Sequence, residues 1–210
     1  MTIRALSLDF GGTLATETPS RATLYAEAAR AQGHARPEAD VDRAMRAVHA
    51  RMPQVVDGWF RYDFPWFERF IDLVFTEELG LPDAAVVALR PGLFDIFADA
   101  GSFNLLPGAR AAIGAARSCG LAVAVTSNWS PALPGLLEGL GLAADLDVVV
   151  VSAMERCEKP DARLFERTAQ RLGVAAHEVL HVGNDLDQDV RGALDAADVG
   201  RGETDDYRHA

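Results

Sequence analysis

The sequence predicts an α/β protein in which a parallel sheet is interrupted by a long helical insertion. Three observations support this fold class. A short apolar run at 3–8 ends in a glycine turn, residues 104–198 alternate helical patterns with short β-branched runs, and residues 17–103 carry helical patterns only. Short β-branched runs between helices are typical of parallel strands joined by right-handed crossovers. We therefore expect a core formed by residues 1–16 and 104–198, and an insertion at 17–103.

The core elements follow one another in a regular order. After the strand at 3–8 and the insertion, we expect helix and strand pairs at 108–118 and 121–127, 131–140 and 147–152, and 161–172 and 178–183, with a last helix at 188–197. The tail from about residue 199 is polar and unpatterned, and we expect it to fray. Ligands of parallel sheets bind at the carboxyl ends of the strands. A functional site is therefore expected at those ends.

The insertion is predicted to be helical throughout. The spacing of its apolar residues predicts helices at 20–32, 38–51, 63–79 and 83–99, and no stretch has the period of a strand. Aromatic residues concentrate in its second half: Trp59, Phe60, Tyr62, Phe64, Trp66, Phe67, Phe70 and Phe75. We therefore expect an all-helical insertion that is rich in aromatic residues.

The charge balance excludes two classes of partner. The formal net charge is −11, whereas nucleic acids and anionic membranes are bound by basic surfaces. No apolar run approaches the roughly 20 residues that span a bilayer, and the first ten residues acquire a charge too early for a signal peptide.

Cys119 and Cys157 are the only cysteines. We expect reduced thiols and a cytoplasmic location.

Polar residues follow each of four predicted strands. They are Asp9, the pair Ser127 and Asn128, Lys159 in the loop after Ser152, and the run Gly183-Asn184-Asp185. In a parallel sheet these ends lie at one edge. The sequence therefore predicts one cleft that combines carboxylates, hydroxyl and amide groups and one lysine.

Each of these residues has a chemical and a structural interpretation. Asp9 can attack an electrophile and form a covalent intermediate, or it can cap a turn. The two glycines after it let backbone N–H groups approach an anion. Ser127 and Asn128 can donate hydrogen bonds to an anion over Asp9, or they can cap the helix that follows. Lys159 can neutralise charge in the cleft, or it can be solvated surface.

Three aspartates follow the last predicted strand. Asp185, Asp187 and Asp189 lie within five residues, and oxygen ligands of this kind suit Mg²⁺. Acidic residues also stabilise the first turn of a helix through its dipole. We assign the helix role to Asp187 and a ligand or supporting role to Asp189.

The four strand ends together resemble the motifs of the haloacid dehalogenase-like superfamily, over the chain to about residue 198. The first family motif is Asp-x-Asp-Gly-Thr after an apolar strand, here Asp9-Phe10-Gly11-Gly12-Thr13. The second is Ser127, and the third is Lys159 before Pro160. The fourth is a Gly-Asp pair with a second Asp five residues on, here Gly183-Asn184 and Asp189. Four motifs in order make a specific signal.

The resemblance implies a Rossmann-like, three-layer core and an all-helical cap that helps to select the substrate. Asp9 would be the nucleophile, and Ser127 and Lys159 would complete the catalytic set. The substrate would also contact residues near the nucleophile: Gly11, Gly12, Thr13 and Asn128. A Mg²⁺ ion would be held by oxygens of Asp9, Gly11, Asn184, Asp185 and Asp189. Most of the tryptophans and Tyr62 would be cap core, with one or two of these aromatic residues contacting the substrate, and Arg21 and Arg61 are candidates for binding an anionic substrate group.

Two positions depart from the family pattern. Gly11 occupies the position of the second motif-one Asp, which in the family serves as the general acid and base. Losing such a positioned acid–base group costs about 10²- to 10⁴-fold in rate. Asn184 occupies the position of a metal-binding Asp, so the site loses one negative charge and Mg²⁺ should bind more weakly. Asp185 could replace that ligand.

Three functions fit this set of residues. The favoured one is hydrolysis of a small phosphorylated metabolite through an aspartyl phosphate on Asp9. A second is a degenerate family member that binds a ligand without turnover, which Gly11 and Asn184 favour. A third is a metal-independent 2-haloacid dehalogenase, which needs no protonated leaving group. Those enzymes usually carry Tyr where Gly11 stands and have a different fourth motif.

Overall fold

The chain divides into two compact units. The computed structural model describes residues 2–199. The first unit comprises Met1–Thr16 and Leu105–Ala210, and the second comprises Glu17–Asn104. Two short strands, β2 (Ala15–Glu17) and β5 (Phe103–Leu105), form a two-stranded sheet where the chain passes from one unit to the other. The predicted frayed tail lies almost entirely outside the described residues.

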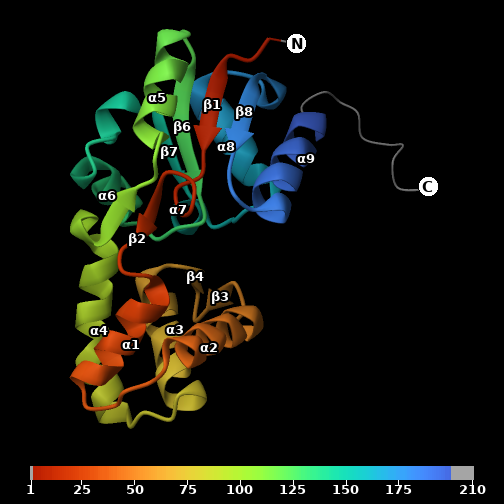
Figure 1. Ribbon diagram of the computed structural model, residues 1–210. Coiled ribbons are helices and arrows are strands. Elements are labelled where there is room, and N and C mark those ends of the chain that lie inside the picture. Colours follow the sequence, from red (N-terminus) through yellow and green to blue (C-terminus); the bar gives the residue numbers. More distant parts are fainter. Residues whose placement is uncertain (1, 200–210) are drawn as a thin grey trace. The chain divides into compact units, whose positions relative to one another are not determined.

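The first unit contains the predicted parallel sheet (Figure 1). Its strands, in the order β7-β6-β1-β8, are β1 (Ala5–Leu8), β6 (Ala122–Ser127), β7 (Val148–Val151) and β8 (Val179–Val182). Leu8 pairs with Val125 of β6 and with Val182 of β8, and Ser127 pairs with Val151. The carboxyl ends of the four strands therefore lie at one edge, with Asp9 after a central strand.

Helices flank this sheet, as the α/β prediction requires (Figure 1). The elements are α5 (Ala109–Ser118), α6 (Leu133–Gly139), α7 (Ser152–Glu155), α8 (Ala162–Leu172), α9 (Gly192–Val199), the 3₁₀ turns η3 (Ala143–Asp145) and η4 (Ala176–Glu178), and the π-helical turn η5 (Leu186–Arg191). In α8, the Asp161 side chain accepts from the backbone N–H of Arg163 at the first turn, and Gly173 ends the helix in a left-handed conformation. These are standard helix start and stop signals.

The second unit is formed mainly by helices. They are α1 (Arg21–Ala31), α2 (Glu38–Arg51), α3 (Phe64–Asp72), α4 (Asp83–Ala98), the π-helical turn η1 (Leu73–Glu78) and the 3₁₀ turn η2 (Ala100–Ser102). Its buried core contains Tyr25, Val41, Trp66, Phe70, Ile71, Phe75, Leu89 and Leu93. Among residues 2–199, no helix combines the length and the apolar character needed to cross a bilayer.

The structure departs from the predicted elements in two ways. The insertion also contains a short antiparallel hairpin, β3 (Val55–Val56) and β4 (Trp59–Phe60). Its turn, Asp57-Gly58, has positive φ at both residues, which is a common hairpin signal. The helices expected at 63–79 and 188–197 each include a π-helical turn.

The two tryptophans of the second unit differ in burial. Trp66 is buried in the core of the second unit, as expected, but Trp59 on β4 is 49% exposed. Trp59 stands next to the hairpin turn, where the two-residue strands offer little surface to cover a large ring. It is therefore not a core residue.

Candidate active site

Asp9 lies directly after the central strand β1 and is 6% exposed. Two side chains donate to the same carboxylate oxygen: Ser127 Oγ lies 2.8 Å from Asp9 Oδ1, and Lys159 Nζ lies 2.7 Å from it. No hydrogen bond to Oδ2 occurs within residues 2–199. One oxygen is thus fixed by donors from β6 and from the loop after α7, while the other accepts no hydrogen bond within the described residues. The three predicted catalytic residues are in direct contact.

Lys159 sits between two carboxylates. Its Nζ also lies 2.5 Å from Asp189 Oδ1, and its side chain is only 2% exposed. Lys159 is the only lysine in the chain, since the other cationic residues are arginines. A buried charge is tolerated when it is paired and hydrogen-bonded. The ammonium group therefore holds the two aspartates together.

Asp189 is fixed from several directions. His181 Nε2 lies 3.1 Å from Asp189 Oδ1, and the backbone N–H of Asp185 donates to Oδ2 at 2.9 Å. Burial raises the pKa of the Asp189 carboxyl, but the hydrogen bonds from His181 and Lys159 outweigh burial and bring the pKa well below its ordinary value. Asp189 is therefore a carboxylate at neutral pH and supplies the permanent counter-charge of Lys159.

A chain of hydrogen bonds continues from His181 across the sheet. His181 Nδ1 lies 3.0 Å from Ser7 Oγ, which donates to Thr126 Oγ1 at 2.8 Å. Thr126 Oγ1 lies 2.7 Å from Thr168 Oγ1, which donates to the backbone carbonyl of Leu164 at 3.0 Å. These partners fix the ring of His181, and the ring orients Asp189.

Asn128 positions the Lys159 loop. Its Oδ1 accepts from the backbone N–H of Lys159 at 2.8 Å, and its Nδ2 lies 3.1 Å from the Lys159 carbonyl and 3.0 Å from Gln188 Oε1. The following helix, α6, starts only at Leu133, without a side-chain cap. The capping interpretation of Ser127 and Asn128 is therefore wrong. Substrate binding by Asn128 remains a prediction, and the structure gives its amide a positioning role.

The ring of Trp129 occupies the space beside Gly11. A Cβ placed on Gly11 would lie 2.9 Å from Cζ3 of the Trp129 ring, closer than non-bonded carbons approach. The ring packs edge-on against Phe10, with centroids 5.0 Å apart. An Asp at position 11 would therefore meet the Trp129 indole with the first atom of its side chain.

Asn184 lies over the turn that follows Asp9. Thr13 Oγ1 is 3.5 Å from Asn184 Oδ1, and a Cβ on Gly12, whose φ is +77°, would lie 2.7 Å from Asn184 Nδ2. Gly12, Thr13 and Asn184 therefore form one exposed rim near the nucleophile. Substrate contacts by Gly12 and Thr13, and metal binding by Asn184, remain predictions.

The proposed metal ligands already have partners in the protein. Both oxygens of Asp189 are bonded, and Asp185 Oδ1 caps η5 by accepting from the backbone N–H groups of Asp187 and Gln188. Asp187 is exposed and pairs with Arg191, in line with a helix role. Within residues 2–199 no three His, Cys, Asp or Glu side chains are grouped to hold a metal ion. Asp9 and Asp185 each keep one carboxylate oxygen that accepts no hydrogen bond within the described residues, but both oxygens of Asp189 are committed, so this donor set does not fit a tightly bound Mg²⁺.

Restoring the missing charge should strengthen Mg²⁺ binding. We expect Asn184→Asp to lower the Kd for Mg²⁺ by about tenfold, because one more negative charge faces the cation at a partly solvated site. Isothermal titration with MgCl₂ measures this change. Asn104→Asp adds the same charge in the second unit and should leave the Kd unchanged. Equal affinities for the wild type and Asn184→Asp would show that residue 184 is not a ligand.

Sequence patterns alone missed two residues of this site. His181 lies in β8, where its side chain is 2% exposed while Leu180 and Val182 are 50% and 42% exposed. In β8 the histidine is therefore buried and its apolar neighbours are exposed, which is the reverse of the usual pattern. The sequence signal of this reversal is a lone histidine in a short apolar strand. Trp129 could have been suspected because it directly follows Ser127 and Asn128. Arg21 and Arg61 lie in the second unit, where Arg21 pairs with Glu17 and Arg61 donates to the Met52 carbonyl.

Comparison with known proteins identifies the family. The model of the haloacid dehalogenase-like hydrolases matches residues 3–197. The bovine haloacid dehalogenase-like hydrolase domain-containing protein 3 (Bos taurus) is 28% identical over 195 residues, which is 91% of this chain and 78% of that protein. The phosphoserine phosphatase of Thermus thermophilus is 35% identical over 143 residues, 64% of this chain and 57% of that enzyme. The matched part is 46% of the mouse (Mus musculus) domain-containing protein 3, so the chain spans about half the length of some relatives.

A solved structure shares the fold. The HAD-hydrolase YfnB of Bacillus subtilis, bound to magnesium, superimposes with a TM-score of 0.72 over 94% of this chain and 85% of that protein, at 15% identity. This likeness concerns the fold, whereas the family match covers nearly the whole sequence. The chain with its Asp9, Ser127, Lys159 and Asp189 cluster belongs to the haloacid dehalogenase-like hydrolases.

Proposed function

We propose that this protein hydrolyses phosphomonoesters of small metabolites in the cytoplasm, with Asp9 as the nucleophile. The observation that carries the proposal is the arrangement around Asp9: one oxygen is held by Ser127 and Lys159, and the other has no partner within residues 2–199. A carboxylate held in this way is oriented to attack. The named phosphatase activity of the Thermus relative supports a phosphate ester rather than another electrophile.

The reaction would proceed in two steps. Asp9 attacks phosphorus, the bond from phosphorus to the ester oxygen breaks, and the alcohol leaves as an alkoxide that takes a proton from water. A second water then attacks the aspartyl phosphate, releases inorganic phosphate and regenerates the Asp9 carboxylate. The Lys159 ammonium group, held beside Asp9, would stabilise the negative charge that collects on the phosphoryl oxygens. No residue equivalent to a second motif-one carboxylate protonates the leaving group, so esters with acidic alcohols should react fastest.

A substrate panel tests the proposal. Phosphate release is measured from phosphoserine, sugar phosphates and aryl phosphates, with and without MgCl₂, beside halide release from 2-chloropropionate. Phosphate release together with a phosphate adduct on Asp9 in mass spectra of quenched reactions is the expected result. Halide release without metal would instead identify a dehalogenase. No turnover of any compound would contradict hydrolysis and favour a binding protein.

Gly11 and Trp129 together should limit the kcat of phosphate release. We expect Gly11→Asp alone to give no gain in kcat, because its Cβ would meet the Trp129 ring 2.9 Å away. Gly11→Asp combined with Trp129→Leu should raise kcat by about 10²-fold toward esters with poor leaving groups, because it supplies an acid and base group and the space for it. Steady-state kinetics with alkyl phosphates measure the gain.

The matched control is Trp129→Leu alone, which opens the space without adding a carboxylate. It should leave kcat close to the wild-type value. A gain in Gly11→Asp without the second change would show that the indole does not obstruct this position. The same gain in Trp129→Leu alone would show that access, rather than proton transfer, limits the wild type.

A further inference from the structure

The surroundings of Asp9 are polar on one side and aromatic on another. Lys159 and Ser127 bond to Asp9 Oδ1, and both of these side chains are buried. At Gly11, two residues after Asp9, the neighbouring side chain is instead the indole of Trp129. A cation and hydrogen-bond donors bind phosphoryl oxygens, whereas an indole binds apolar and aromatic groups. A phosphate ester at Asp9 would therefore have its phosphoryl group toward Lys159 and its organic group toward Trp129.

The Trp129 ring turns its edge to the backbone of Gly11. A Cβ on Gly11 would lie 2.9 Å from Cζ3 but 3.7 and 3.8 Å from Cη2 and Cε3, the ring atoms on either side. A point above the ring would be more nearly equidistant from these three atoms, so the approach is in the plane of the ring. The faces of the indole are therefore not turned toward Gly11. Because the side chain is half-buried, part of the ring is accessible beside the turn that follows Asp9.

The main chain and a second ring hold the indole in this place. The backbone N–H of Trp129 donates to Ser152 Oγ at 3.1 Å, and the Trp129 carbonyl accepts from the backbone N–H of Ala153 at 3.4 Å. Ser152 and Ala153 begin α7 and are buried. Phe10, which is fully buried, packs against the indole with the two planes at 82°. An aromatic side chain that is already ordered loses little entropy when another ring binds to it.

Gly11 imposes a second condition on the leaving group. No side chain at residue 11 can protonate the departing oxygen, so this oxygen leaves as an anion. A phenol resembles tyrosine, whose pKa is about 10, whereas an aliphatic alcohol is nearly as weak an acid as water, whose pKa is about 15.7. Acyl and enol phosphates meet this second condition but have no ring for the indole. An aryl ester meets both conditions.

We propose that the substrate class of this site is an aryl phosphate, with the ring of the leaving group against the Trp129 indole. The assignment rests on the proposed function, hydrolysis at Asp9. A bond forms from Asp9 Oδ2 to phosphorus, the bond from phosphorus to the aryl oxygen breaks, and the electron pair leaves with that oxygen as a phenolate. The protein supplies no proton in this step. Trp129 is thus a specificity residue, and it acts on substrate binding.

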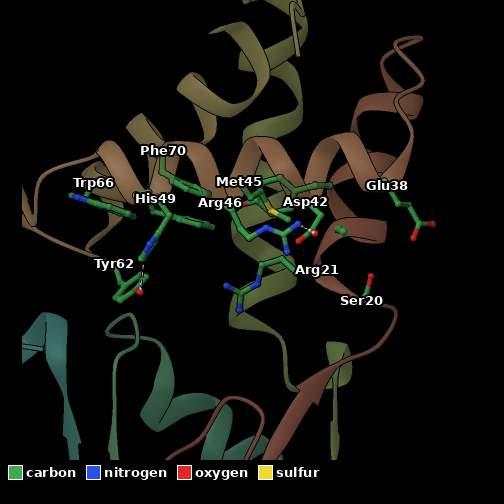
Figure 2. A pocket seen from close by; sticks show the side chains of 15 residues that line it. Ser20, Arg21, Glu38, Asp42, Met45, Arg46, His49, Tyr62, Trp66 and Phe70 are labelled. Carbon is green, nitrogen blue, oxygen red and sulfur yellow. Dashed lines mark hydrogen bonds and ion pairs between the residues drawn. The ribbon is translucent and has the colours of Figure 1, made fainter. Parts of the chain in front are cut away.

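Another aromatic surface lies in the second unit. A cavity of about 960 Å³ there is lined by residues that include Tyr62, Trp66 and Phe70 (Figure 2). A preference for aromatic esters could arise at this surface as well as at Trp129. A variant of the cavity is therefore needed to distinguish the two surfaces.

Steady-state phosphate release from three esters tests the assignment on the full chain. Phenyl and 2-naphthyl phosphate release phenols of similar acidity but differ in ring area, and ethyl phosphate has neither the ring nor the acidic oxygen. We expect kcat/KM to be about 10³-fold higher for phenyl than for ethyl phosphate. It should rise about tenfold further for 2-naphthyl phosphate, because the larger ring makes more contact with the indole.

Three variants locate the origin of the naphthyl preference. Trp129→Leu should abolish it through KM, with kcat nearly unchanged, and Trp129→Phe should retain most of it because a ring remains. Phe67→Leu alters the lining of the cavity in the second unit and is the matched control, so it should keep the wild-type ratio. Equal kcat/KM for the phenyl and naphthyl esters in the wild type would overturn the assignment. Faster release from ethyl phosphate, or loss of the preference in Phe67→Leu and not in Trp129→Leu, would also overturn it.

A binding measurement separates the ring contact from hydrolysis. Calorimetry compares (2-naphthylmethyl)phosphonate, which cannot be hydrolysed, with methylphosphonate. The naphthyl compound should bind about tenfold more tightly to the wild type and to Phe67→Leu, and Trp129→Leu should lose this preference. That binding pattern without turnover of any ester would contradict hydrolysis at Asp9 while supporting the ring contact at Trp129. Turnover of esters without that binding pattern would support hydrolysis and overturn the role of Trp129.

Discussion

Replacing Asp9 by asparagine is expected to reduce phosphate release by about 10⁴-fold or more. The amide is nearly isosteric, and its oxygen can still accept from Ser127 and Lys159, but it cannot form an acyl phosphate. The variant should therefore fold, with a change in unfolding free energy of about 1 kcal/mol. Steady-state phosphate release and urea unfolding measure the two effects separately.

Asp187→Asn is the matched control for this change. Asp187 is an exposed carboxylate near the same strand end and pairs only on the surface with Arg191. Its substitution should leave kcat within about twofold, because exposed ion pairs contribute little. If Asp9→Asn retained activity, the nucleophile would be another residue, and the covalent mechanism would have to be abandoned.

The periodicity of the sequence predicts most of the architecture. Each strand of the main sheet lies within an expected apolar run, and each longer helix overlaps an expected helical pattern. The two-residue strands β3 and β4 were missed because they are too short for an alternating pattern. The Asp57-Gly58 turn between them was the available signal.

The sequence predicts only those residues of the site that directly follow a strand or lie at its carboxyl end. Asp9, Ser127 and Lys159 were found because parallel strands bring their carboxyl ends to one edge, and the structure places their side chains in contact. His181 was missed because its role depends on which face of β8 is buried. A four-residue strand with exposed apolar residues does not reveal that face. The contact between Trp129 and Gly11 depends on the path of a loop, which no periodic pattern describes.

The geometry of the site also explains why residue 159 is a lysine and not an arginine. An arginine in place of Lys159 would be a broad, planar fork, whereas Asp9 Oδ1 and Asp189 Oδ1 both approach one nitrogen, at 2.7 and 2.5 Å. A compact ammonium group fits between two oxygens in this way. The geometry therefore accounts for a lysine at a position where the rest of the chain would use arginine.

Lys159→Met should be the most destabilising change at the site. It retains a side chain of similar length but leaves Asp9 and Asp189 buried without a cation, and breaking a buried ion pair in this way typically costs about 3–5 kcal/mol. Urea unfolding measures the loss. Phosphate release should also disappear, because the charge that faces the phosphoryl oxygens is removed.

A second substitution separates the electrostatic cause from packing. Lys159→Met combined with Asp189→Leu removes one of the two uncompensated carboxylates, and we expect it to recover about half of the lost stability without recovering activity. Because Lys159 is the only lysine, ¹³C-lysine labelling gives one side-chain resonance. That resonance should shift in Asp9→Asn and not in Asp187→Asn. An unshifted resonance in Asp9→Asn, or no recovery in the double variant, would mean that Lys159 does not link the two aspartates in solution.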